Sequence, residues 1–404
     1  MKDYNNYDEY KEGYKEGYNK GFNEDYFYDE ELEYKRNRRK LRLFKVISTL
    51  TIIIFAMVAI FIAFPGINKD KEEKIMEDYK KVQDVKVPTD SEPTADPHEG
   101  MAKSLFTGLW IDENVVNNRP VAIMFNNIKE ASPQSGTSEM DILYEAVVEG
   151  GITRLMGISQ NVNSNRIGSL RSARPYYVSI AKEYDAIYIH VGGSTDAKNK
   201  IASLGLTDFD GNTGKGSAIM YRDNSIRAPH NAFTSKERID KLITSNVTRT
   251  DYEGKTDNHF TFNDEVQSIK GDGKAKSKVA LELSGYAKPY FTYNETDKLY
   301  YRYQFDTAHI DKNTGKQLSF ANIIIQYVKQ WTYDSHGRQA MDIYDSNGDG
   351  IYISAGEYKN IRWKRNESRR TMQYLEDGQL LQVNPGKTYI ALVPNDKKEK
   401  TTIY

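Results

Sequence analysis

An uncharged apolar run near the N-terminus constrains this chain more than any other feature. Residues 46–64 read VISTLTIIIFAMVAIFIAF. A run of this length without a charge can cross a bilayer as a helix. Residues 35–45, just before it, contain seven Lys or Arg and no acid. The positive-inside rule therefore predicts a cytoplasmic N-terminus and an extracytoplasmic remainder. The basic block lies well inside the chain and no small-residue cleavage site follows, so we expect an uncleaved single transmembrane helix at the cell membrane.

The segments on either side of this run are not typical of a folded core. Residues 1–34 are acidic and rich in Tyr and Gly, with aromatic residues recurring every four positions. This composition predicts a disordered cytoplasmic tail, and a segment that docks a cytoplasmic partner is the alternative. Residues 65–104 are charged and then Pro-rich, which is typical of an extracytoplasmic stalk or linker. We expect the globular part to begin near Leu105.

Composition excludes several classes of site. The chain of 404 residues contains no cysteine, so disulfides, thiolate metal sites and a cysteine nucleophile are excluded. A formal net charge of -1 gives no basic signal for nucleic acid, and we expect no nucleic-acid partner. The glycine-rich stretches HVGGS and GKGS lack the spacing of nucleotide-binding loops, so we expect no cofactor.

The pattern beyond the stalk predicts an α+β protein. Residues 105–250 alternate apolar strands with capped helices, which predicts an N-terminal α/β domain. Residues 275–397 contain short alternating aromatic strands separated by turn signals, which predicts a mostly β C-terminal domain. The helices expected in the first domain are 138–148, 174–184, 195–204 and 235–243. The main strands expected are 120–126, 152–160, 186–191, 299–305, 323–328, 351–353, 361–363 and 388–393.

Charged residues in the first domain form the main candidate site. Asp141, Glu145 and Glu149 are spaced by four, so on a helix they would lie on one face. The nearest cations in the sequence are Arg154, Arg171 and Arg174. One interpretation is a structural ion-pair network between helix and sheet. The other is that burial keeps one carboxyl group protonated as a proton donor.

Two histidines are further candidates. His190 ends a predicted strand and precedes GGS, a position where α/β sheets commonly carry sites, whereas His230 lies in a loop before a helix. A lone histidine at such a place is more often a hydrogen-bonding core residue. Neither histidine has metal-ligand spacing, so we expect no metal site.

Residues 345–358, DSNGDGIYISAGEY, resemble a calcium-binding loop at their start. Asp345, Asn347 and Asp349 supply oxygens at positions 1, 3 and 5, but position 12 holds Gly356 instead of a carboxylate. The flanking segments also have the pattern of strands. We therefore expect a hairpin turn formed around Asp345, Asn347, Gly348 and Gly350, and no calcium site.

Five motifs indicate a family. NRPVAIMFNN, DILYEAVVEGGITR, IGSLRSARPYY, EYDAIYIHVGGS and YRDNSIRAPHNAFTS resemble, in order and spacing, the first domain of the YerB-like family of bacterial envelope proteins. Weaker matches, such as ANIIIQYV and NPGKTYIALVP, extend the resemblance to the second domain. The family is best known as lipoproteins of Gram-positive bacteria, of unknown function. The resemblance implies an outer-face location and two domains, with a transmembrane helix here in place of the lipid-bearing cysteine.

These observations leave three hypotheses. The first is a peptidoglycan glycan-cleaving enzyme, of lytic transglycosylase or glycosidase type, with a Glu as general acid. Its catalytic candidates are Glu145, Glu149, His190 and His230. Its substrate-binding candidates are Asp141, Arg154, Arg171, Arg174, Tyr176 and Asn231. The second hypothesis is a non-catalytic wall-binding or scaffold protein that links envelope partners across the membrane. The third, calcium-dependent adhesion, rests on the loop at 345–350 alone.

Overall fold

The computed structural model describes residues 98–254, 261–344, 346–366 and 371–404. Residues Ala95–Tyr404 form one compact unit. The predicted tail, basic block and transmembrane helix, together with most of the predicted stalk, lie outside the described residues. Within the described ranges, no helix is both long enough and apolar enough to span a membrane.

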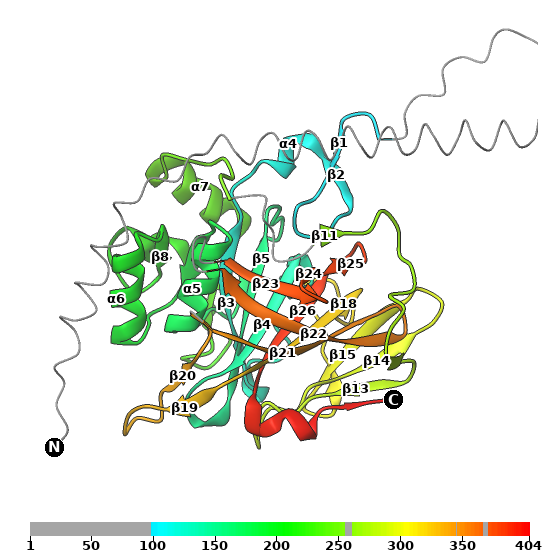
Figure 1. Cartoon of the computed structure of the whole chain (residues 1–404). Coiled ribbons are helices and arrows are strands. Elements are labelled where there is room, and N and C mark those ends of the chain that lie inside the picture. Colours follow the sequence, from blue (N-terminus) through cyan, green and yellow to red (C-terminus); the bar gives the residue numbers. More distant parts are fainter. Residues whose placement is uncertain (1–97, 255–260, 345, 367–370) are drawn as a thin grey trace, which may run out of the picture. The chain divides into compact units, whose positions relative to one another are not determined.

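A sheet of 12 strands runs through the unit (Figure 1). Its strand order is β24-β23-β22-β21-β18-β26-β4-β5-β3-β7-β8, and β12 pairs with β22. The strands are β3 (Val121–Asn127), β4 (Ile142–Val147), β5 (Thr153–Ser159), β7 (Ile187–His190), β8 (Asp208–Asp210), β12 (Gly273–Lys274), β18 (Asn322–Val328), β21 (Asn347–Ser354), β22 (Glu357–Asn366), β23 (Thr371–Glu376), β24 (Gln379–Leu380) and β26 (Thr388–Pro394).

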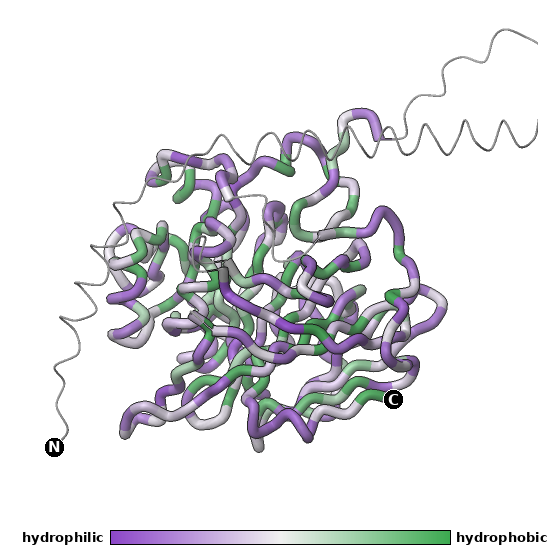
Figure 2. Tube along the Cα trace, viewed as in Figure 1, coloured by the Kyte–Doolittle hydropathy of each residue, from purple (hydrophilic) through white to green (hydrophobic). Residues whose placement is uncertain are grey.

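The middle strands of this sheet are buried on both faces. Every residue of β18, β26, β4, β5 and β3 is buried. Their sequences are nearly continuous apolar runs, such as VAIMF in β3, rather than alternating ones. Such runs are typical of strands covered by other layers on each side. Figure 2 shows hydrophobic segments inside the molecule and hydrophilic ones in many of its outer loops.

Helices cover one face of the sheet. They are α5 (Pro175–Glu183), α6 (Thr195–Leu204) and α7 (Lys236–Asn246), and they confirm three of the four predicted helices. Helix α5 lies against β4 and β5, because Tyr176 Oη donates to Val147 O and Tyr177 Oη donates to Arg154 O, each at 2.6 Å. Side chains of Ser194 and Ser235 cap α6 and α7.

A second sheet of six strands covers the other face. It contains β13 (Lys278–Ala280), β14 (Tyr290–Asn294), β15 (Leu299–Gln304), β16 (Thr307–Ala308), β17 (Ser319–Phe320) and β27 (Thr402–Ile403). Phe291 of β14 packs against Tyr389 of β26 with the two rings tilted by 59° and their centroids 4.9 Å apart. In Figure 1 this sheet lies on the side of the central sheet away from α5 and α6.

Smaller elements complete the fold. They are β1 (Met101–Lys103), β2 (Trp110–Asp112), α4 (Glu113–Val116), β6 (Ile167–Gly168), β9 (Tyr221–Arg222), β10 (Ala232–Thr234), β11 (Thr261–Phe262), β19 (Gln330–Thr332), β20 (Gln339–Met341), β25 (Gln382–Val383) and the 3-10 turns η2 (Lys129–Ala131), η3 (Thr137–Glu139), η4 (Glu149–Gly151), η5 (Gly214–Ile219) and η6 (Asn395–Lys400).

The two predicted regions share one sheet. Strand β26, from the C-terminal region, pairs in parallel with β4, from the N-terminal region, over Thr388–Leu392 and Ile142–Ala146. The fold is mostly β with a few helices, consistent with the predicted α+β class. One hydrophobic core draws residues from both regions.

The predicted helix over 138–148 is wrong. The structure has the 3-10 turn η3 and then strand β4 in this segment. The local spacing of the acids favoured a helix, but the apolar residues of β4 are buried on both faces between β5 and β26. Four residues of strand span roughly 13 Å, so Asp141, Glu145 and Glu149 do not form a compact stripe.

The predicted turn at 345–350 is also misplaced. Asn347 to Asp349 lie within β21, and the hairpin turns at Ala355 and Gly356, whose φ values are 50° and 78°. Two positive φ values are what a type I′ turn requires. The glycine at 348 is needed for another reason, because a Cβ there would lie 2.6 Å from Trp363 Nε1. Asp345 lies outside the described residues.

Candidate functional site

One edge of the central sheet gathers polar side chains. The parallel strands β3, β7 and β8 end at this edge, and β5, which is antiparallel to β3, begins there. Arg154 of β5 pairs with Asn126 of β3 at this point. Helix α5 starts beside them, with Arg174 as its N-cap. Ligands of open α/β sheets commonly bind at the carboxyl ends of parallel strands.

We call this group of residues the strand-end site. It consists of Asn126, Glu149, Arg154, Arg171, Arg174, Tyr188 and His230.

Arg174 and Glu149 form the one close ion pair of the strand-end site. Arg174 Nη2 lies 2.5 Å from Glu149 Oε1, and its Nη1 donates to Ala173 O at 2.6 Å. Burial alone would raise the pKa of Glu149, but the hydrogen bond and charge of Arg174 outweigh it and lower that pKa. Glu149 is therefore a carboxylate at neutral pH.

Arg154 lies in the same cluster without a hydrogen-bonded partner. Arg154 is only 8% exposed. Its Nε and Nη1 atoms have no hydrogen-bond partner in the described part of the chain. Burial, followed by the charge of Arg174, lowers the pKa of Arg154 to about 10. The guanidinium remains a cation at neutral pH, enclosed and unpaired.

Arg171 and His230 extend the site outward. Arg171 Nη2 lies 2.6 Å from His230 Nδ1, and Asn126 Nδ2 lies 2.9 Å from the same atom. Both neighbours are donors, so Nδ1 accepts and the ring proton is on Nε2. Burial and the charge of Arg171 lower the pKa of His230, whereas burial and the charge of Arg222 lower the pKa of Arg171 to about 10. The strand-end site thus holds three arginines against one carboxylate.

Glu145 lies on the opposite face of the sheet. It is fully buried, and its carboxylate accepts from four donors: Asn127 Nδ2 at 2.9 Å, Thr153 Oγ1 at 2.7 Å, and Arg302 Nη2 and Tyr389 Oη at 2.6 Å each. Arg302 also contacts the ring of His309, whose Nε2 lies 2.6 Å from Gln134 Oε1. Burial and the charge of Arg302 hold the pKa of His309 well below its usual range. Glu145 therefore belongs to a closed structural network that joins the two sheets.

His190 is also enclosed. It is 1% exposed, its Nδ1 lies 2.8 Å from Gly192 O, and its Nε2 lies 3.0 Å from Asp208 Oδ2. Both ring nitrogens are engaged, so the ring fixes the loop after β7.

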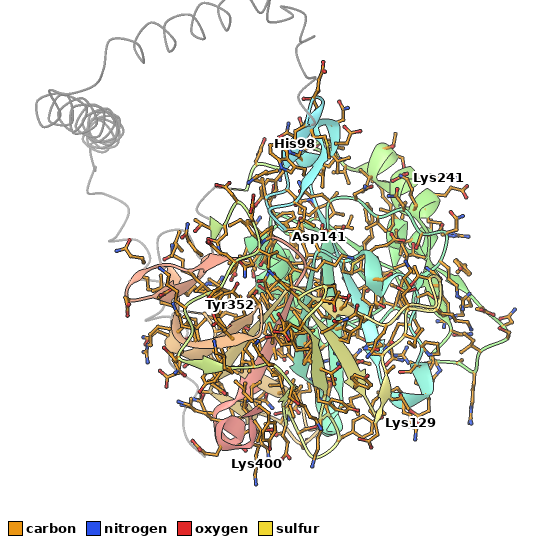
Figure 3. All side chains as sticks on the ribbon, turned by 90° about the vertical axis from the view of Figure 1, so that its right-hand side faces the viewer. His98, Lys129, Asp141, Lys241, Tyr352 and Lys400 are labelled. Atoms are coloured by element: carbon orange, nitrogen blue, oxygen red, sulfur yellow. The ribbon has the colours of Figure 1, made fainter. Side chains whose placement is uncertain are left out.

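The remaining predicted residues are dispersed. Asp141 precedes β4 and accepts from Gln160 N, and burial raises its pKa. Figure 3 shows Asp141 toward the middle of the molecule in that view, whereas Lys241 and Lys400 lie at its outline. Tyr176 Oη donates to Val147 O. Asn231 Oδ1 accepts from Arg222 Nη1 at 2.9 Å.

The structure therefore brings some of the predicted residues together and separates others. The group that converges is Glu149, Arg154, Arg171, Arg174 and His230, with Tyr176 packed beneath. Asp141, Glu145 and Asn231 do not join this group. His190 lies beside it, with its ring centroid 4.9 Å from that of Tyr188, but is enclosed. No cluster of three or more His, Asp or Glu suited to a metal ion occurs in the described part of the chain. Asp349 of the calcium-like loop is instead held by Arg362 and by Lys398.

Sequence reasoning missed Arg302, Tyr389 and Tyr188. Arg302 occupies an inward position of an alternating strand, LYYRYQ, between buried Tyr300 and Gln304. The alternation was visible, but which face is buried depends on sheet packing. The one sequence signal for Arg302 was a charged residue at the same alternate positions as Tyr300 and Gln304.

Comparison with known proteins agrees with this architecture. Residues 106–252 match a family model described as the N-terminal domain of a protein of unknown function, DUF3048, and residues 279–390 match the DUF3048 C-terminal domain. The chain belongs to the DUF3048 family. A Bacillus subtilis protein named "Putative lipoprotein YerB" is 32% identical over 308 residues, covering 72% of this chain and 86% of the relative.

A solved crystal structure has the same fold. The crystal structure of YerB protein from Bacillus subtilis matches with a TM-score of 0.65 at 28% identity, and the match covers 75% of this chain and 99% of that chain. The predicted resemblance to the YerB-like family is confirmed.

Proposed function

We propose that this protein is anchored in the cell membrane and that its folded part binds peptidoglycan outside the cell without cleaving it. The proposal gives the predicted transmembrane helix over 46–64 the role of the anchor. The name of the YerB relative, which describes a lipoprotein, supports an envelope location reached by a different anchor.

The state of the two candidate acids carries the proposal. A general acid for glycan cleavage needs a raised pKa so that it holds a proton near neutral pH. Glu145 accepts four hydrogen bonds, one from the buried Arg302, and is closed to solvent. The pKa of Glu149 is lowered through Arg174. Glu145 is therefore inaccessible to a glycan and Glu149 is held as a carboxylate, so neither suits the role of an accessible general acid.

The charge of the strand-end site favours binding of acidic groups. Arg154, Arg171 and Arg174 face one carboxylate, and arginine suits planar recognition of carboxylates. The stem peptides of peptidoglycan carry free carboxylates, so the wall offers a ligand of matching charge.

Purified sacculi incubated with the full chain in detergent test the proposal. We expect the protein to sediment with sacculi and the glycan strands to remain intact by mass spectrometry, under conditions in which a muralytic control enzyme cleaves them. We expect no cleavage of the glycan strands by either the wild type or a Glu149→Gln variant. Release of shortened glycan strands by the wild type, lost in this variant, would contradict the proposal.

One observation favours glycan cleavage as a second candidate function. The Glu149 side chain is 27% exposed, so it is the one candidate acid that a sugar can approach. A bound glycan that displaced Arg174 from Glu149 would remove the interaction that lowers its pKa. The mass-spectrometric experiment separates the two functions directly.

A further inference from the structure

Arg154 is an exception among the buried arginines. Arg302, fully buried, is paired with Glu145 at 2.6 Å. Arg365 is paired with Glu183 at 2.8 Å. Arg154 is more than nine-tenths buried, yet Nε and Nη1 have no partner among the described residues. An unpaired buried charge is strongly unfavourable, so proteins rarely keep one without a use for it.

The surroundings of Arg154 do not supply the missing anion. Glu149 is the nearest carboxylate, but both of its oxygens lie within bonding distance of Arg174 Nη2. Two further enclosed atoms lack partners in the described part of the chain, namely Arg174 Nε and Tyr188 Oη. Burial raises the pKa of Tyr188, and the charges of Arg174 and Arg154 act against this, so the three side chains are neighbours. Each of them has a donor without a partner in the described part of the chain.

The start of helix α5 also favours a negative charge near Arg154 and Arg174. Its N-cap residue, Arg174, makes no capping hydrogen bond with its side chain, and Pro175 follows at the first helical position. The backbone N–H groups of the first turn and the positive end of the helix therefore favour a negative charge here. By itself this would not make a site, but it coincides with the unpaired Arg154.

We propose that the enclosed part of the strand-end site holds a single carboxylate group of a ligand, contacted by Arg154, Arg174 and the Tyr188 hydroxyl. The charge count selects this class. Arg154 and Arg174 against Glu149 leave one net positive charge, which a carboxylate balances and a phosphate dianion would exceed. Two carboxylate oxygens also match the forked donors of guanidinium. Arg171, farther out, meets the remainder of the ligand.

This inference rests on the proposed function, because it identifies the group of peptidoglycan that is bound as a stem-peptide carboxylate. It also makes a claim independent of any ligand. A residue kept for binding, without a structural partner, should be replaceable at no cost to folding.

The first experiment compares two buried arginines in the ligand-free full chain. Arg154→Met should leave the unfolding temperature unchanged or raise it, because it removes an unpaired buried charge. Arg302→Met should lower the unfolding temperature clearly, because it leaves Glu145 buried and unpaired. If Arg154→Met lowers the unfolding temperature as much as Arg302→Met does, Arg154 is structural and the inference is overturned.

The second experiment measures binding by calorimetry, using a disaccharide pentapeptide with all its carboxyl groups free and the same compound with every carboxyl group amidated. We expect the amide, and separately the Arg154→Met variant with the free acid, to bind roughly thirty-fold more weakly or worse. Equal binding of acid and amide would overturn the inference, as would saturation by inorganic phosphate without any effect of the pentapeptide.

Sedimentation with sacculi distinguishes this failure from failure of the proposed function. If the wild type and the Arg154→Met variant bind sacculi equally well, only the assignment of Arg154 is overturned. Wild-type protein that does not bind sacculi would overturn the proposed function itself.

Discussion

At the residue scale, Glu183 shows how burial changes the chemistry of an ordinary side chain. It ends helix α5, is closed to solvent, and lies 2.8 Å from Arg365 of β22. Burial raises the pKa of Glu183 to about 7, even though the charge of Arg365 acts in the opposite direction. The sequence contained no sign of this, because Glu183 is one of many acids near a helix end.

A pH dependence of stability follows from this pKa. The folded-state pKa lies above the ordinary value of 4.5, so the folded state binds the proton more tightly than the unfolded state does. The stabilisation is complete below about pH 4.5 and is lost as the pH rises through about 7, a change of roughly 3 kcal/mol. Urea unfolding of the wild type and of Glu183→Gln at both ends of this range measures it. The free energy of unfolding of the variant should lack this part of the pH dependence. The same pH dependence in the wild type and the variant would contradict the assignment.

At the scale of elements, the hairpin β21–β22 explains a glycine pattern that resembled a calcium loop. Gly348 lies opposite Trp363 across the hairpin, and the indole fills the space that a side chain would need. Trp363 is itself buried, with its Nε1 donating to Tyr327 O at 2.9 Å. The glycine is therefore required by packing, since the tryptophan cannot retreat without losing that hydrogen bond.

A matched pair of substitutions tests this packing. Gly348→Ala should destabilise the protein by about 1–3 kcal/mol, because its Cβ would overlap the Trp363 ring. Gly285→Ala is the control, since its φ is not positive and no atom lies within 4 Å of the added Cβ. Chemical denaturation monitored by tryptophan fluorescence measures both. Equal effects of the two substitutions would mean that the ring adjusts freely.

At the scale of the whole molecule, the two family regions contribute strands to one sheet and residues to one buried ion pair. Strand β26 is paired with β18 of its own region on one side and with β4 of the other region on the other side. The buried pair Glu145–Arg302 crosses the same boundary. Each region alone would expose an unpaired central strand edge and a buried charge without its partner.

Cooperative unfolding is the expected consequence. Calorimetry of the full chain should give one transition for the part described by the structure, without separate transitions for residues 106–252 and 279–390. Either region expressed alone should lack the sharp, cooperative melting of the whole chain. Two transitions that follow the family boundary, or a cooperatively melting isolated region, would show that the shared sheet does not couple the regions.

The sequence by itself determined most of the local elements. The bounds of α6 were predicted at both ends, because its cap and the following Gly205 act within a few residues. The central strands β3 and β5 were predicted as apolar strands of the first domain, and β18 and β26 from short β-rich segments between turn signals. The family motifs, and the nearness in sequence of Arg154, Arg171 and Arg174 to the acids, were also visible.

Only the tertiary structure decided how these elements are paired and what the charged residues do. The segment over 138–148 has the spacing of a helix and becomes β4 because β5 and β26 pair with it. Glu145 meets Arg302, which lies 157 residues away in the chain, so it is a structural residue. Arg154 meets no such partner and is left as a candidate ligand contact. Local patterns fix backbone preference and polarity over a few residues, whereas the partner of a buried charge depends on distant segments brought together by the sheet.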